Sequence, residues 1–110
     1  MNTLKNKVQL IGNLGNDPEI TNFESGKILA KFSIATNDSY KNAQGEKITD
    51  TQWHNVVAWG KTAQIVEKYI TKGKEVAIEG KLTSRSWEDK DGMKRYVTEV
   101  VCNELLMLGK

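Results

Sequence analysis

Alternating apolar and polar residues dominate the first half of the chain. Between residues 28 and 35, the side chains that a sheet would bury occupy every second position: Ile28, Ala30, Phe32 and Ile34. This period of two predicts a half-buried strand. Residues 8–14 predict an earlier strand, in which Gly12 and the following Gly15 are candidate positions for a bulge or bend.

Polar and turn-forming residues separate these strands from each other and from a third. Asn16-Asp17-Pro18 and Ser25-Gly26 supply turn chemistry between the first two strands. The polar residues 37–50 predict a long hairpin tip, which joins the second strand to a third at residues 52–59.

The hydrophobic period changes only once, just after Gly60, where a short helix is expected. Thr62 can cap this helix, and Gly73 is well placed as its left-handed stop. The predicted apolar stripe consists of Ile65, Val66, Tyr69 and Ile70. Alternation then returns at residues 76–82 and 96–106, which predict a fourth and a fifth strand.

The turn between the last two strands has a strong local signal, because Asp91-Gly92 is typical of a two-residue type I′ turn. The resulting register pairs Asp89 with Lys94, Glu88 with Arg95, and Trp87 with Tyr96. Opposite charges and aromatic rings are favourable cross-strand pairs. Continued toward the sheet, the same register places Leu82 opposite Val101 in the core, although a bulge could shift it.

Five short strands with one helix between the third and the fourth predict an all-β fold with one short helix. This arrangement matches the oligonucleotide/oligosaccharide-binding (OB) fold, a five-stranded Greek-key barrel. The 110 residues are the size of one domain, so we expect residues 1–110 to form a single OB-fold domain.

Composition narrows the class of protein. A hydrophobic fraction of 38% and a charged fraction of 27% are typical of a soluble globular chain. The longest stretch without a charged side chain, Thr51–Gly60, is far shorter than the ~20 residues of a spanning helix. Cys102 is the only cysteine, which excludes an internal disulfide and a paired-thiolate zinc site. We therefore expect a cytoplasmic protein with no metal and no cofactor.

Motifs for catalysis are weak. Gly60-Lys61-Thr62 imitates the end of a phosphate-binding loop, but Asn55 stands where that motif requires glycine. His54 and Cys102 are the only candidates for a nucleophile and its base, and an enzyme would need them to act together. We expect His54 to be packed or interfacial and Cys102 to be a small buried residue.

The aromatic residues are more informative. Trp53 and Trp59 share parity with Asn55, so both indoles should project from one wet sheet face. Trp87 lies in a charged hairpin, and Tyr40 lies in the polar loop. The alternatives are that the strand tryptophans belong to the core and that Tyr40 is merely a loop residue.

Each of these rings has basic residues close by in the sequence: Lys41, Lys61, Arg85, Lys94 and Arg95. Rings beside cations suit single-stranded nucleic acid, because exposed bases stack while phosphates meet the charges. The net charge is only +2, so stacking, at ~1–3 kcal/mol per base, should carry most of the affinity. We therefore expect weak sequence preference.

Three blocks of the sequence together carry a family resemblance: residues 6–18 (NKVQLIGNLGNDP), 53–61 (WHNVVAWGK) and 76–82 (VAIEGKL). In this order and spacing, the chain resembles the bacterial-type single-stranded DNA-binding (SSB) proteins from about Asn6 to Gly109. The resemblance implies an OB barrel without catalytic activity. It also implies a homotetramer that coats single-stranded DNA during replication, recombination and repair, at the nucleoid in the cytoplasm.

Residue by residue, the resemblance implies base stacking by Trp53, Trp59, Trp87 and Tyr40. It implies DNA contacts by the basic residues Lys7, Lys61, Lys72 and Arg85, and a position near a subunit interface for His54. Asn55 and Ser86 stand where many family members are basic.

Members of the family typically continue into a linker and an acidic tip, whereas this sequence stops at Lys110. We therefore expect residues 1–110 to recruit no tail-dependent protein partner. The main alternative binding function is that of a replication-restart or RNA-binding barrel of the same fold.

Overall fold

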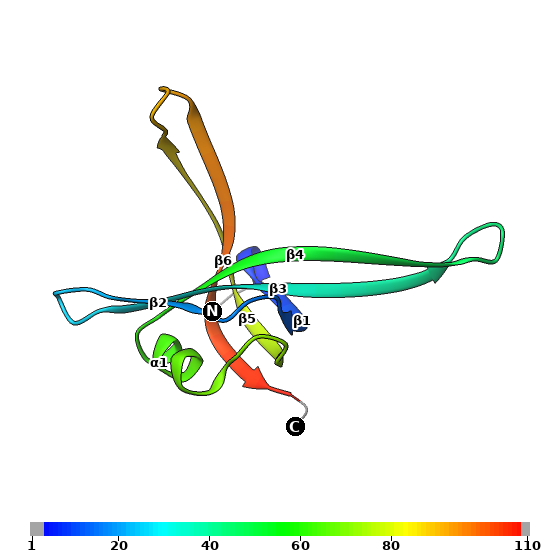
Figure 1. Cartoon of the computed structure of the whole chain (residues 1–110), viewed down its shortest axis with the longest axis horizontal. Coiled ribbons are helices and arrows are strands. Elements are labelled where there is room, and N and C mark those ends of the chain that lie inside the picture. The colour runs from blue at the N-terminus through cyan, green and yellow to red at the C-terminus, as the bar shows by residue number, and fades with distance from the viewer. Residues whose placement is uncertain (1–3, 109–110) are drawn as a thin grey trace.

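A computed structural model describes residues 4–108 and contains a closed barrel of five strands (Figure 1). The barrel strands are β1 (Val8–Leu14), β3 (Ile28–Lys41), β4 (Lys47–Trp59), β5 (Glu75–Glu88) and β6 (Lys94–Met107). They are hydrogen-bonded in the order β1-β5-β6-β4-β3, and β1 pairs again with β3 to close the barrel. The β4–β6 pairing is parallel, and the others are antiparallel. The predicted barrel is confirmed.

Three smaller elements complete the described chain: the 3₁₀ helix η1 (Leu4–Asn6), strand β2 (Glu19–Asn22) and helix α1 (Gly60–Tyr69). Strand β2 pairs with the outer edge of β3 and was not predicted, because only Ile20 of its four residues is even half-buried. Helix α1 lies between β4 and β5, as predicted. Within residues 4–108, no helix combines the length and apolar character needed to cross a membrane.

The core fills the barrel and extends to α1, which packs against β3, β4 and β6. Its buried members are Leu14, Ile28, Ala30, Phe32, Ile34, Val56, Ala58, Ala63, Val66, Ile70, Val76, Ile78, Val100 and Cys102. The alternation predicted for residues 28–35 supplies four of them. The core therefore comes mainly from inward-facing positions of the strands.

The predicted details of the helix are partly wrong. Thr62 lies inside α1, and no side chain caps the first turn. The buried stripe is Ala63, Val66 and Ile70, whereas Ile65 and Tyr69, both predicted to belong to it, are exposed. Gly73, with φ of 87°, lies beyond the helix in the turn to β5, where its N–H donates to Leu14 O at 2.9 Å.

The β3–β4 hairpin is a ribbon rather than a polar loop. Its strands run to Lys41 and restart at Lys47, so only residues 42–46 form the turn. Pairing continues outward through Asn37–Thr51 to Lys41–Lys47. The ribbon projects far from the barrel on the right of Figure 1.

The predicted register of the β5–β6 hairpin holds only near the barrel, where Ile78 pairs with Leu105. The register shifts by one residue between Glu79 and Gly80. A Cβ on Gly80 would lie 2.0 Å from Val101 O, so this close approach requires glycine. Beyond the bulge, Leu82 pairs with Val100 and is exposed, which contradicts its predicted core position.

The hairpin tip explains why the predicted pairs are wrong. Asp89 N–H donates to Met93 O and Gly92 N–H donates to Asp89 O, which leaves a three-residue loop. Gly92 has a positive φ but Asp91 does not, whereas a type I′ turn needs both. The observed pairs are Glu88–Lys94, Trp87–Arg95 and Ser86–Tyr96.

Candidate nucleic-acid interface

The outer face of β3 and β4 carries both strand tryptophans. The register pairs Ala35 with Trp53 and Leu29 with Trp59, with the Ser33–Asn55 row between them. Trp53 is 61% exposed and Trp59 is 46% exposed, so the alternative that these rings belong to the core is wrong. Asn55 is exposed on the same face, as its parity predicted.

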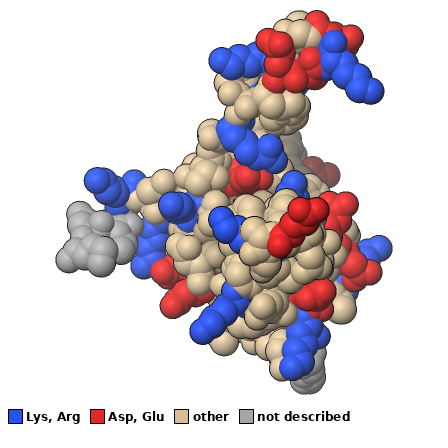
Figure 2. Space-filling model, turned by 90° about the vertical axis from the view of Figure 1, so that its left-hand side faces the viewer, with Lys and Arg blue, Asp and Glu red and all other residues tan. Residues whose placement is uncertain are grey.

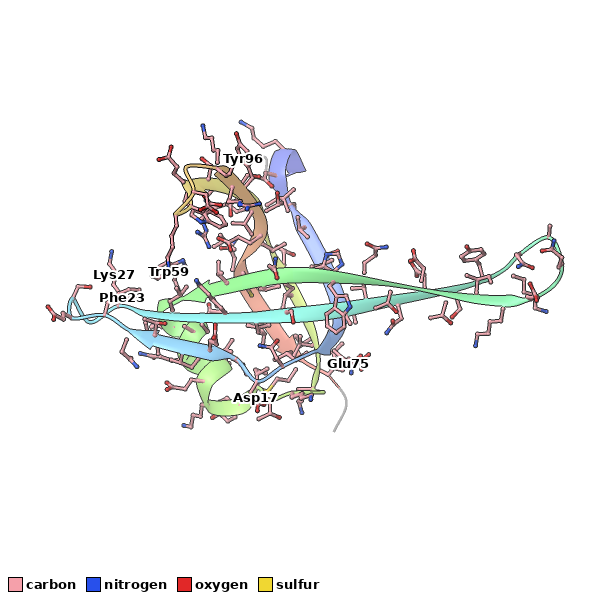
Figure 3. All side chains as sticks on the ribbon, turned by 45° about the horizontal axis from the view of Figure 1, so that its top comes forward. Asp17, Phe23, Lys27, Trp59, Glu75 and Tyr96 are labelled. Atoms are coloured by element: carbon pink, nitrogen blue, oxygen red, sulfur yellow. The ribbon has the colours of Figure 1, made fainter. Side chains whose placement is uncertain are left out.

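Trp59 does not stand alone. The ring of Phe23, in the hairpin between β2 and β3, stacks on it with centroids 6.0 Å apart and planes inclined by 21°. Figure 3 shows the two side chains together at this end of the barrel. Sequence reasoning missed Phe23, because the hairpin that positions it depends on the unpredicted strand β2.

Trp53 lies against the backbone of Gly15. A Cβ built on Gly15 would lie 2.3 Å from Trp53 Cζ3, so the ring occupies the space that any side chain there would need. Gly15 N–H donates to Ser33 O at 3.1 Å, and Ser33 in turn donates its N–H and its hydroxyl to Asn16 Oδ1. Gly15 and Asn16, which follow β1, therefore hold the backbone on which the Trp53 indole packs.

The β5–β6 hairpin contributes Trp87, which is 47% exposed. The Arg85 guanidinium lies 5.6 Å from the centroid of this ring, and Arg85 Nε also donates to Glu99 Oε1 at 3.1 Å. At the tip, Arg95 Nε donates to Asp89 Oδ2 at 2.8 Å. The Arg95 guanidinium, helped by the Met93 N–H, holds the pKa of Asp89 below its ordinary value.

Two tyrosine rings, Tyr40 and Tyr96, lie on the opposite face of their hairpins from the tryptophans. Tyr40 lies in β3, not in a loop, and its row with Ile48 has the opposite parity to the Ala35–Trp53 row. Tyr96 is on the far face of its hairpin from Trp87, because the bulge shifts the register by one residue. Both tyrosines are exposed.

A hollow of about 350 Å³ lies on the tryptophan face, between β3–β4 and the β5–β6 hairpin. Among the described residues, Arg85 is the one predicted DNA-contacting cation that lines it, together with Lys31, which sequence reasoning missed. Lys7 is instead paired with Glu79 at 3.5 Å, Lys61 lies in the first turn of α1, and Lys72 lies beyond the end of α1. The structure therefore does not gather all four predicted cations in one place.

Charge alone does not mark the interface. Figure 2 shows basic and acidic side chains interspersed over the face that it presents, including the projecting β5–β6 hairpin at the top. This mixture agrees with the net charge of +2. Aromatic exposure is therefore the more informative feature.

The two candidate catalytic residues, His54 and Cys102, each make a hydrogen bond within the protein, and not to each other. His54 is half-buried, and its Nε2 shares a hydrogen bond of 3.0 Å with Thr36 Oγ1. Cys102 is buried, its Sγ–H donates to Glu104 O, and burial raises its pKa to about 11. A thiol in this state is a weak nucleophile. Among residues 4–108, no cluster of three His, Cys, Asp or Glu side chains could hold a metal ion.

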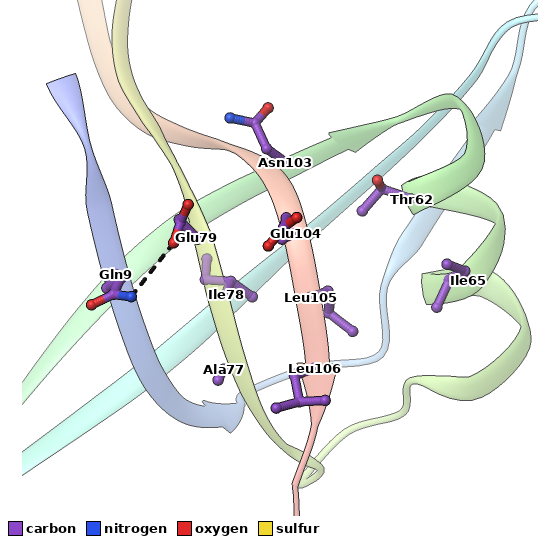
Figure 4. Close-up of a pocket in the computed structure, with 10 residues that line it drawn as sticks. All are labelled: Gln9, Thr62, Ile65, Ala77, Ile78, Glu79, Asn103, Glu104, Leu105 and Leu106. Carbon is purple, nitrogen blue, oxygen red and sulfur yellow. Dashed lines mark hydrogen bonds between the residues drawn. The ribbon is translucent and has the colours of Figure 1, made fainter. Parts of the chain in front are cut away.

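A second surface feature is an apolar row across β1, β5 and β6. The register aligns Ile11, Ala77 and Leu106 on the outer face of these strands, and Ile11 and Leu106 are 61% and 62% exposed. Figure 4 shows the adjoining hollow of about 510 Å³, which Leu106 and Ile65 of α1 line from two sides. Exposed apolar side chains that adjoin in this way are typical of an interaction surface.

Comparisons with known proteins agree on one family. The model of the single-strand binding protein family matches residues 5–108. The chain is 50% identical over 105 residues to single-stranded DNA-binding protein 1 of Chlorobaculum tepidum, covering 94% of this chain but only 65% of that protein. It is 47% identical over 106 residues to single-stranded DNA-binding protein 1 of Xylella fastidiosa, covering 96% and 78%.

A solved structure gives the same result for the fold. The Plasmodium falciparum SSB complex with ssDNA matches with a TM-score of 0.86 at 30% identity. The match covers 94% of this chain and 95% of that one. The similarity in fold therefore extends over nearly the whole chain.

Proposed function

The chain belongs to the single-strand binding protein family, and from this premise we propose that it binds single-stranded DNA, largely independently of sequence. The observation that carries the proposal is the pair of exposed indoles on one sheet face. Trp53 and Trp59 are six positions apart on β4, which is about 20 Å along a strand. Several nucleotides can therefore lie between the two rings.

Base stacking supplies most of the affinity in this proposal. Trp53, Trp59 supported by Phe23, and Trp87 supported by Arg85 each offer a ring face to a base. Each stack contributes ~1–3 kcal/mol. Tyr40 offers a further ring to a strand that passes around the edge of the β3–β4 ribbon.

Phosphate contacts have the smaller part. Arg85 is the best placed, because it lines the hollow beside the stacking face. Lys7, Lys61 and Lys72 are exposed on neighbouring elements and can meet the phosphates of a strand that continues past the hollow. Ion pairs with Glu79 and Glu99 compete with DNA for Lys7 and Arg85, respectively.

We further propose that the protein acts by binding alone, and that it coats and protects single-stranded DNA during replication, recombination and repair at the nucleoid. The protonated Cys102 thiol and the engagement of His54 with Thr36 support binding without catalysis. Residues 1–110 act as one binding domain in this proposal.

We also propose a homotetramer. The exposed apolar row of Ile11, Ala77 and Leu106 is a surface that a second copy can cover, with the same row meeting itself across a two-fold axis. His54 lies near a subunit boundary in this assembly. A single barrel offers a site of only ~4–16 nucleotides, so several copies are needed to wrap longer DNA.

Titration of the intrinsic tryptophan fluorescence tests the proposed function. We expect oligo(dT) to quench the fluorescence strongly, because bases stack on the indoles, and duplex DNA to have little effect. Oligo(rU) tests the alternative of an RNA-binding barrel. Quenching by oligo(rU) alone, or by no single strand, would contradict the proposal.

A further inference from the structure

The hollow on the tryptophan face lies where the intervening nucleotides must pass. Its floor includes the Ser33–Asn55 and Lys31–Val57 rows, which separate Trp53 from Trp59. It continues into a second hollow of about 250 Å³ beside Trp59. The main hollow, at about 350 Å³, is within the range of small-molecule pockets, about 300–1,000 Å³. It is therefore large enough to receive the edge of a base.

Asn55 brings an uncommitted amide to this hollow. Its register partner Ser33 is already engaged, since the Ser33 hydroxyl donates to Asn16 Oδ1 at 2.8 Å. The Asn55 side chain, by contrast, has no hydrogen-bond partner within the described part of the chain. Both its N–H donors and its carbonyl oxygen are available to a ligand.

Glu99 supplies an acceptor to the same hollow. Its side chain is only 12% exposed, and Oε1 accepts the Arg85 Nε–H at 3.1 Å. No residue between 4 and 108 donates to Oε2. An ionised carboxylate can only accept hydrogen bonds, so this oxygen distinguishes donors from acceptors on a base.

Bases differ at the edge that these two groups would meet. Cytosine and adenine carry an amino donor beside a ring-nitrogen acceptor, which match the Glu99 carboxylate and the Asn55 amide. The single ring N–H of thymine lies between two carbonyl oxygens, which repel a carboxylate that approaches it. The pair of groups therefore favours cytosine and adenine over thymine.

We propose that this hollow reads one base of the bound strand, with Asn55 and Glu99 as specificity-determining residues that favour cytosine or adenine over thymine. The inference rests on the proposed function, because it concerns DNA bound on the tryptophan face. It adds a preference at one nucleotide to a site that otherwise tolerates any sequence.

The test compares the affinities of the full chain for oligo(dC), oligo(dA) and oligo(dT) of equal length at one salt concentration. Glu99→Gln keeps the shape of the side chain but adds a donor that thymine oxygens accept. We expect Glu99→Gln and Asn55→Ala each to shift the dC:dT and dA:dT affinity ratios about fivefold or more toward thymine. The control Lys61→Ala should weaken binding to all three oligonucleotides equally.

Each other outcome has a defined meaning. Unchanged ratios in both variants overturn the inference. A uniform gain in affinity for all oligonucleotides in Glu99→Gln also overturns it, because Glu99 would then only compete with phosphate for Arg85. Failure of the unsubstituted chain to bind any single strand would instead overturn the proposed function. Each affinity ratio compares oligonucleotides on the same sample of one variant. A loss of folded protein therefore lowers all the affinities of that variant together and leaves the ratio unchanged.

Discussion

Single aromatic residues carry most of the binding free energy in the proposed function. We expect Trp53→Ala, Trp59→Ala and Trp87→Ala each to weaken oligo(dT) binding by ~1–3 kcal/mol, because each removes one stacking surface. The control is Tyr69→Ala, which removes an equally exposed ring from α1, away from the tryptophan face. Binding by titration and stability by thermal unfolding are measured together. Loss of ~3–5 kcal/mol of stability with unchanged affinity would indicate a packing role instead.

Gly15 leaves the space that one of these rings, Trp53, occupies. Gly15→Ala places a methyl group where the Trp53 ring lies, while the backbone φ at this position does not require glycine. The ring must move, so we expect weaker oligo(dT) binding and an altered Trp53 emission spectrum.

A double-mutant cycle separates this effect from general damage. Gly15→Ala should weaken binding in the natural background but add little to Trp53→Ala, because its effect passes through that ring. If the two losses simply add, Gly15 acts on binding by another route.

Among the elements, the β5–β6 hairpin has a tip whose conformation is stabilised by one carboxylate, that of Asp89. Asp89 Oδ1 accepts the N–H groups of Asp91 and Met93, and Oδ2 accepts from Arg95. The pKa of Asp89 is lowered, so its contribution is complete above the pKa that this group has in the unfolded chain. The contribution is lost as pH falls through the lower pKa of the folded state.

The hairpin tip should therefore stay ordered through the pH range in which an ordinary aspartate is protonated, and loosen only in stronger acid. NMR signals of Met93 and Arg95 amides report this transition. Asp89→Asn should loosen the tip already at neutral pH, while the neighbouring Asp91→Asn should not, because only the backbone N–H of Asp91 takes part in the network. A titration in the ordinary aspartate range would contradict the assigned contacts.

For the whole molecule, the proposed tetramer depends on the apolar row of Ile11, Ala77 and Leu106. We expect a sedimentation-equilibrium mass of about four times 12.4 kDa at micromolar concentration. Leu106→Lys should lower this mass, because it places a charge in the row without disturbing the core. Leu82→Lys, at an exposed leucine outside the row, is the matched control. A mass of 12.4 kDa for the unsubstituted chain would contradict the tetramer.

Local pattern by itself determined the class of fold and part of the candidate interface. The period of two in residues 28–35 and its change after Gly60 predicted the barrel strands and the helix, because successive side chains of a strand point to opposite faces of the sheet. The same parity, with Asn55 between Trp53 and Trp59, correctly predicted two exposed rings on one face.

Only the tertiary structure decided how distant segments align. The close approach of Gly80 to Val101 shifts the β5–β6 register and sends Trp87 and Tyr96 to opposite faces, although the Asp91-Gly92 signal had paired them. The contact of Phe23 with Trp59, and the hollow that brings Asn55 to Glu99, likewise join elements far apart in sequence. Such contacts depend on distances across the barrel, and a local period of residues carries no information about those distances.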